Sequence, residues 1–172
     1  QLGQLDGALR SNQYGLMLKP DSLELFFNRG NLLRENKMPL EAVEAYESAI
    51  RIKPDVVETH MNLGIVLLTL RRFKDANDSF DRALKLQTKR LLSSQQNSLG
   101  AVLLNGSIFY NKALALEKLL LASSAIKYYQ KSILIQPDLA EGYDAFYRVF
   151  YGANDFKSAD VVLKKALFIE PA

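Results

Sequence analysis

The sequence contains no cysteine, only one histidine, and no apolar run long enough to cross a membrane. Without cysteine the chain has no disulfides and no thiolate metal ligands, which favours the cytoplasm or another reducing compartment. A spanning helix needs about 20 mostly apolar residues. The apolar run in GIVLLTLRRF, residues 64–73, has already ended at Arg71. We therefore expect no membrane insertion, and the compartment itself stays open.

Concentrated charge and catalytic motifs are also missing. The net charge is only +3 over 172 residues, whereas nucleic-acid-binding domains usually carry a concentrated basic face. His60 has no second His or Cys at metal-ligand spacing, and the sequence has no glycine-rich phosphate loop. These absences predict no catalytic residue, no metal, no cofactor and no nucleic-acid partner. His60 is expected to be a structural residue.

What the sequence does contain is a repeat. Pro20 and Pro54 are 34 residues apart, as are Pro137 and Pro171. On this spacing four blocks align: residues 23–56, 57–90, 106–139 and 140–172. Small residues recur at block positions 8 (Gly30, Gly64, Ala113), 20 (Ala42, Ala76, Ala125, Ala159) and 27 (Ala49, Ala83, Ser132, Ala166), with large ones at 24 (Tyr46, Phe80, Tyr129, Leu163). Each block is predicted to be a helix, a short turn and an antiparallel helix that a proline ends.

This pattern resembles the tetratricopeptide repeat family, whose repeats have small residues at positions 8, 20 and 27 and proline at 32. The resemblance covers residues 23–172 apart from an insertion at 91–105, and residues 1–22 look like the second helix of a further unit. It implies an all-α fold, a right-handed α-solenoid of stacked antiparallel helix hairpins.

Several positions depart from the family pattern. Thr88 replaces the expected proline of the second block, so that helix is expected to run on. The insertion 91–105 is interpreted as a loop plus a helix extension: residues 91–97 should be mobile, and 98–118 should form one unusually long first helix, capped near Asn97 or Ser98. Tyr147 at position 8, where a small residue is expected, should make the fourth hairpin splay or shift. The uncapped ends predict a chain cropped from a longer array or covered by neighbouring subunits.

The resemblance also implies a binding site, because the first helices of such repeats line a concave groove. The groove positions are Phe27, Asn28, Asn31, Met61, Asn62, Ile65, Leu68, Tyr110, Asn111, Leu114 and Arg148. Position 6 is asparagine in three blocks (Asn28, Asn62, Asn111), and an amide can both donate to and accept from a peptide bond. We expect these three side chains to be solvent-accessible, with the apolar members dominating affinity. The same stripe could instead contact a neighbouring subunit or a missing segment of the chain.

One family specificity is not supported. Repeats that hold the C-terminal carboxylate of heat-shock chaperones use cations at positions where this chain has Phe27, Ser107 and Asn111, although Asn31 and Asn62 match. The resulting prediction is a non-catalytic interaction module or scaffold that binds an extended peptide or amphipathic helix of a partner protein. Two alternatives remain: a repeat segment that presents substrates to a catalytic domain outside this chain, or a structural subunit of a multiprotein assembly.

Overall fold

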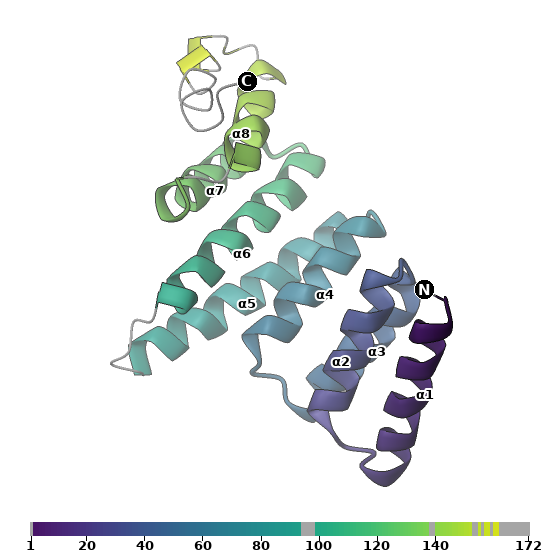
Figure 1. The fold of residues 1–172 in the computed structure, drawn as a ribbon. Coiled ribbons are helices and arrows are strands. Elements are labelled where there is room, and N and C mark those ends of the chain that lie inside the picture. The colour runs from purple at the N-terminus through teal and green to yellow at the C-terminus, as the bar shows by residue number, and fades with distance from the viewer. Residues whose placement is uncertain are drawn as a thin grey trace. The chain divides into compact units, whose positions relative to one another are not determined.

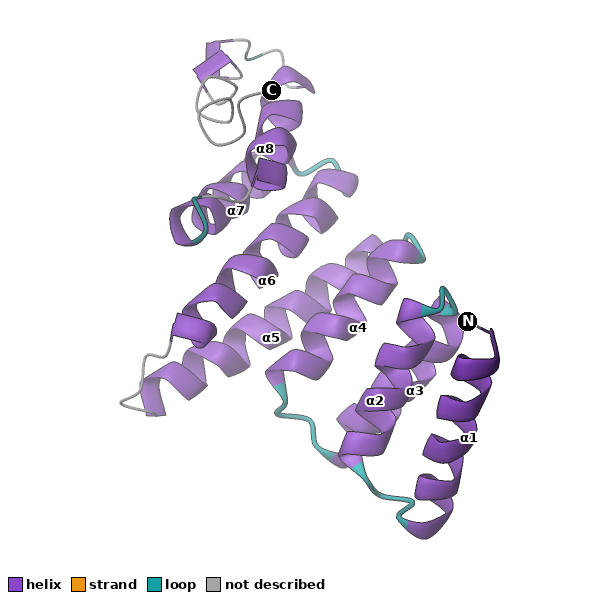
Figure 2. Ribbon diagram, in the orientation of Figure 1, coloured by secondary structure: helices purple, strands orange, loops and turns teal. Residues whose placement is uncertain are grey.

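The computed structural model describes residues 2–93, 99–137 and 140–152, together with residues 155, 157–158 and 160–161. Within these residues all regular secondary structure is α-helical (Figure 1), and Figure 2 shows short loops between the helices. The helices are α1 (Leu2–Leu18), α2 (Leu23–Glu35), α3 (Pro39–Ile52), α4 (Val57–Thr69), α5 (Phe73–Ser93), α6 (Leu99–Lys118), α7 (Ala122–Ile135) and α8 (Ala140–Gly152). The prediction of an all-α fold of helix hairpins is confirmed.

The chain forms two compact units, Gln1–Leu86 and Gln87–Ala172, and α5 passes from the first into the second. In unit 1, α1 packs on α2, α2 on α3, and α3 on α4. Local sequence sets the helix starts: the Ser22 hydroxyl accepts a hydrogen bond from the Leu25 amide at the start of α2, and Pro39 opens α3 where no amide proton is needed.

Two glycines allow the helices of unit 1 to approach closely. A Cβ atom at Gly30 would lie 2.5 Å from the buried ring of Tyr46, and a Cβ atom at Gly64 would lie 2.6 Å from the buried ring of Phe80. Each glycine is at position 8 of its block, and each ring is at position 24. The small residue therefore makes room for the aromatic ring that the following helix places against it.

The turns α2–α3, α4–α5 and α6–α7 share one backbone geometry. Each contains a residue with positive φ: Lys37 (60°), Arg71 (59°) and Leu120 (62°). In the third turn the Leu121 amide then donates to the Leu116 carbonyl over 2.9 Å, a Schellman hydrogen bond that caps the preceding helix. The left-handed conformation costs a residue with a Cβ atom roughly 1–2 kcal/mol, so these turns hold some backbone strain.

Replacing Leu120 with glycine is expected to raise the free energy of unfolding by about 0.5–1 kcal/mol. The Leu120 side chain is 90% exposed, so its removal loses little packing while the backbone strain is relieved. The control is Lys127→Gly: this lysine is exposed in the middle of α7, where glycine should cost about 1 kcal/mol. Urea unfolding of both variants checks the opposite signs, and a loss of stability in Leu120→Gly would contradict the prediction.

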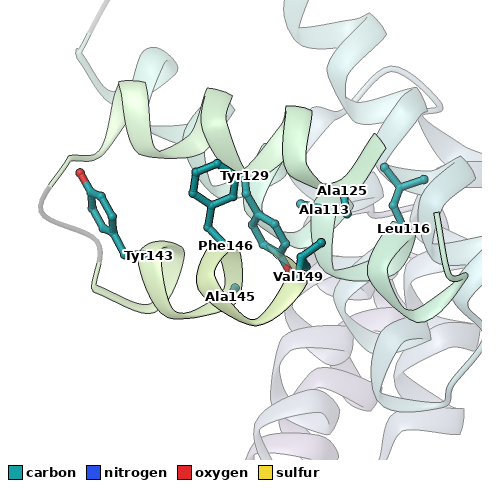
Figure 3. Close-up of a cluster of buried hydrophobic side chains, with 8 residues drawn as sticks. All are labelled: Ala113, Leu116, Ala125, Tyr129, Tyr143, Ala145, Phe146 and Val149. Carbon is teal, nitrogen blue, oxygen red and sulfur yellow. The ribbon is translucent and has the colours of Figure 1, made fainter. Parts of the chain in front are cut away.

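Unit 2 is built from α6, α7 and α8, with α6 packed on both α7 and α8. Figure 3 shows its core, where aromatic rings from α7 and α8 lie beside small residues. The buried members are Ala113, Leu116, Ala125, Tyr129, Tyr143, Ala145, Phe146 and Val149. The first part of α6 also packs on the end of α7, because the Ser132 hydroxyl donates to the Gly106 carbonyl over 3.0 Å.

The insertion differs in part from its prediction. Helix α6 has 20 residues against 13 in α2, α4 and α8, which confirms the long first helix. Helix α5 runs on past Thr88 to Ser93, as the missing proline predicted. Residues 91–93 are therefore helical, and the prediction of a mobile loop from 91 was wrong there. The rest of that loop and the cap near Asn97 or Ser98 lie outside the described residues. Most of the second half of the fourth block, on which the expected splaying by Tyr147 depends, lies outside them as well.

Candidate partner-binding surfaces

In unit 1 the predicted site residues gather on one side of α2 and α4. The Asn62 amide nitrogen donates to the Asn31 Oδ1 over 2.9 Å, so the two helices lie side by side at these positions. We call this region the α2–α4 surface, with members Phe27, Asn28, Asn31, Arg34, Met61, Asn62, Ile65 and Leu68. Intervals of three and four residues put the members of each helix on one face. Its four apolar side chains are partly exposed.

A polar network lies at the centre of the α2–α4 surface. The Tyr46 hydroxyl donates to the Asn31 Oδ1 over 2.7 Å, the same oxygen that accepts from Asn62. The Arg34 Nη1 donates to the Asn62 Oδ1 over 3.5 Å. Burial raises the pKa of Tyr46 to about 12, which keeps its hydroxyl protonated at neutral pH. Both amide oxygens are thus occupied by protein donors.

The expectation that Asn62 is solvent-accessible was wrong. Its side chain is only 7% exposed, because it lies between Asn31 and Arg34 and bonds to both. Asn28 is exposed, as expected, whereas Asn111 is only partly so and donates its amide proton to the Ser107 carbonyl of its own helix over 2.9 Å. The three asparagines therefore lie in three different environments.

The corresponding region of unit 2 is charged. We call it the α6–α8 surface, with members Tyr110, Asn111, Leu114, Glu117, Asp144, Arg148 and Tyr151. The Arg148 guanidinium lies 3.7 Å from the Glu117 carboxylate and 2.6 Å from that of Asp144. The buried Tyr129 hydroxyl donates to Glu117 over 2.7 Å. Burial and the neighbouring Glu117 carboxylate raise the pKa of Tyr129.

Five members of these networks were not among the predicted site residues: Arg34, Tyr46, Glu117, Tyr129 and Asp144. Arg34 and Glu117 both occupy block position 12, one turn beyond Asn31 and Leu114 on the same helix face. That spacing was the available signal, but charged residues on a repeat usually lie on a solvated face. Arg148 was predicted, and the structure adds that two carboxylates already neutralise it.

His60 is a structural residue, as expected. Its side chain is 8% exposed, and its Nε2–H donates to the Pro54 carbonyl over 2.8 Å. This bond ties the start of α4 to the loop before it. Burial lowers the pKa of His60, an effect that the bond to Pro54 only partly offsets.

Unit 1 is therefore expected to lose stability as the pH falls from about 7 to about 5.5, because an unfolded histidine takes up its proton near pH 6.5. With a lowered pKa in the folded state, the unfolded chain binds more protons in this window, so the free energy of unfolding must decrease. His60 is the only histidine, which makes the effect assignable. Urea unfolding at both pH values should show a smaller decrease of the free energy of unfolding in His60→Phe than in the unsubstituted chain. An equal decrease in the two proteins would mean that a group other than His60 causes the pH dependence.

Within the described residues, no three His, Cys, Asp or Glu side chains come together in a way that could hold a metal ion. None of the helices in the same residues is long and apolar enough to cross a membrane.

Stacked helix hairpins with small residues facing aromatic rings define a class, the α-solenoid repeat proteins. Family profiles described as tetratricopeptide repeat match residues 27–90 and 106–139, more than half of the chain. The chain belongs to the tetratricopeptide repeat family. Members of this family generally act as protein-interaction scaffolds, and the repeats of this chain make it a protein-interaction scaffold as well. No curated protein sequence matches it significantly.

Solved structures with the same fold agree with this assignment. A crystal structure of MamA has a TM-score of 0.84 at 23% identity, covering 98% of this chain and 90% of its own. A MamA fragment from Desulfovibrio magneticus RS-1 has a TM-score of 0.84 at 17% identity, covering 98% and 86%. PilW, described as a type IV pilus biogenesis factor, has a TM-score of 0.78 at 23% identity, covering 99% and 72%. At these identities the similarity concerns the fold alone.

Proposed function

We propose that the chain is a non-catalytic adaptor that binds an extended segment of a partner protein along the α2–α4 surface. The observation that carries the proposal is the composition of this surface. Phe27, Met61, Ile65 and Leu68 are partly exposed beside a polar network that the protein itself holds in place. Peptide-binding sites typically combine apolar side chains, which supply most of the binding energy, with a few positioned polar groups that set the register of the peptide.

The two kinds of group contribute differently to binding. Burying an exposed Leu, Ile, Met or Phe side chain contributes about 1.5–3 kcal/mol, whereas a neutral hydrogen bond contributes about 0.5–1.5 kcal/mol net. Affinity should therefore depend mostly on the apolar members. The network adds little entropic cost on binding, because Asn31 and Asn62 are already fixed by their bonds to Tyr46, Arg34 and each other.

The test is a binding titration with a purified partner protein identified by affinity capture. Leu68→Ala should weaken binding about 10-fold or more, because it removes an apolar contact. Glu47→Ala, at an exposed position of α3, is the matched control and should leave the affinity unchanged. A thermal melt of each variant controls for folding. If Glu47→Ala abolished binding while Leu68→Ala did not, the partner would bind the outer helices and the proposal would fail.

A further inference from the structure

Unit 1 has a groove on the face of α2 that is turned away from the α2–α4 surface. Helix α2 packs on both α1 and α3, and the groove lies between these two outer helices with a volume of about 450 Å³. Phe26 and Arg29 of α2 form its floor, about half a turn around the helix from Phe27 and Asn31. We call it the α1–α3 groove, lined among others by Leu16, Met17, Phe26, Arg29, Glu41 and Glu44.

The α1–α3 groove is elongated. A second hollow continues it towards Ile52, since Phe26 and Ser48 line both. From Glu41 to Ile52 the helix α3 rises by about 16 Å. Extended chain covers this length with about five residues. A hollow of this shape fits a segment of a polypeptide better than a compact small molecule.

The groove leaves apolar surface accessible that the next repeat buries. His60 and Leu63, at the equivalent block positions of α4, are both only 8% exposed. Phe26 and Arg29 are partly exposed instead, and Met17 on the wall formed by α1 is 76% exposed. An accessible aromatic floor beside an exposed methionine is surface that gains free energy when a partner covers it.

Two carboxylates form the opposite wall of the groove. Glu41 and Glu44 are exposed and lie one turn apart on α3, a spacing at which like charges repel. Among the residues that the structure describes, no ion pair joins the side chains of Glu41, Glu44 or Arg29 to another residue. The wall therefore carries uncompensated negative charge, and a cation between the two carboxylates would relieve their repulsion.

The equivalent positions of the other second helices do not offer this combination. In α7 they are Ser124 and Lys127, so a cation would be repelled there. In α5 they are Asp75 and Asp78, but Arg72 already pairs with Asp75 at 2.7 Å. Accessible apolar surface beside two unpaired carboxylates is thus found in the α1–α3 groove and not at these positions of α5 and α7.

We infer that the α1–α3 groove is a second protein-binding site, which takes a partner segment that carries a Lys or Arg side chain flanked by apolar residues. The cation lies between Glu41 and Glu44, and its apolar neighbours pack on the exposed apolar members of the groove. Arg29 donates to a backbone carbonyl of the segment. This site is separate from the α2–α4 surface, so the chain can hold two different segments at the same time.

The experiment is a selection from a random displayed peptide library on the intact chain. Peptides that also bind the double variant Glu41→Lys/Glu44→Lys are removed, because this variant keeps the α2–α4 surface but reverses the charge of the groove wall. A thermal melt confirms that the double variant is folded. The surviving peptides should be enriched in Lys or Arg next to apolar residues. No surviving peptide, or survivors without such enrichment, would overturn the inference.

Substitutions in the chain then locate the strongest surviving peptide. Met17→Ala should weaken its binding about 5- to 10-fold by removing apolar contact, and Glu44→Gln about 3- to 5-fold, the range for one exposed ion pair. The matched controls are Tyr14→Ala and Glu47→Gln, which change exposed side chains of α1 and α3 that do not line the groove. Each control should change the affinity by less than about twofold.

A double-mutant cycle tests the ion pair itself. Replacing the basic residue of the peptide with glutamine should weaken binding to the unsubstituted chain about 3- to 5-fold, but should have little further effect on Glu44→Gln. The binding of the unmodified peptide should also weaken as the salt concentration rises, because the pair is exposed. Additive effects of the two changes would place the cation away from Glu44 and overturn the inference.

Leu68→Ala separates this inference from the proposed function. A peptide in the α1–α3 groove should bind Leu68→Ala as tightly as the unsubstituted chain, because Leu68 belongs to the α2–α4 surface. Weaker binding to Leu68→Ala with unchanged binding to Met17→Ala would place the peptide on the α2–α4 surface and overturn the inference. The proposed function would stand in that case, since it depends on Leu68 and not on the groove.

Discussion

The free energy of unfolding of a Gly64→Ala variant is expected to be about 2 kcal/mol lower than that of the unsubstituted chain. The added Cβ atom would lie 2.6 Å from the ring of Phe80, which is fully buried, so the ring cannot swing out into solvent without losing its packing. Helices α4 and α5 must then separate, and overpacking of this kind costs about 1–3 kcal/mol, partly offset by the better helix propensity of alanine. Chemical unfolding followed by circular dichroism measures the difference.

Two further variants show whether the Phe80 ring is the cause. Gly7→Ala, in α1, introduces the same atom where nothing lies within 4 Å, and it should stabilise the helix by up to about 1 kcal/mol. Phe80→Leu should restore space, so the double variant Gly64→Ala/Phe80→Leu should be more stable than the sum of the two single changes predicts. Additive effects would mean that the ring is not the obstacle.

The helix hairpins could be predicted because their signals are local and periodic. Gly30 and Gly64 recur at the position that faces Tyr46 and Phe80, and the proline spacing marks the block length. The missing proline at Thr88 likewise predicted a longer helix, since nothing else in that segment ends it before Ser93. The start of the loop was misplaced because the 34-residue block ends at Arg90, whereas Leu91 and Leu92 are good helix formers and α5 continues through them to Ser93.

The candidate site could be predicted only as a set of positions. Periodicity places Asn28, Asn62 and Asn111 on corresponding helix faces, but it does not show which neighbour each amide will bond. Asn62 is buried because Asn31 and Arg34 both contact it, and these contacts depend on how α2 and α4 are aligned along their axes. Whether an arginine is neutralised is equally a tertiary property: Arg34 and Arg148 look alike in the sequence, and only Arg148 has close carboxylates on an adjacent turn and an adjacent helix.

The fold of unit 2 should depend on Tyr129 more than on any polar residue at its surface. Tyr129→Ala is expected to lower the free energy of unfolding by about 4 kcal/mol, because it leaves a cavity among the side chains of Figure 3 and also removes a hydrogen bond. Tyr129→Phe keeps the ring and removes only the hydrogen bond from the Tyr129 hydroxyl to Glu117. It should cost about 1.5–3 kcal/mol, since the acceptor is the Glu117 carboxylate.

Tyr46→Phe is the matched control, because Tyr46 is equally buried at the same block position but donates to the neutral amide of Asn31. A bond to a neutral acceptor contributes about 0.5–1.5 kcal/mol, so this variant should be less destabilised than Tyr129→Phe. In a Glu117→Gln background, where the charge is absent, the cost of Tyr129→Phe should fall to the same level. Urea unfolding of the five proteins measures these differences. Equal costs for both Tyr→Phe changes would mean that the charge of Glu117 adds nothing to the bond, and that Arg148 and solvent already screen it.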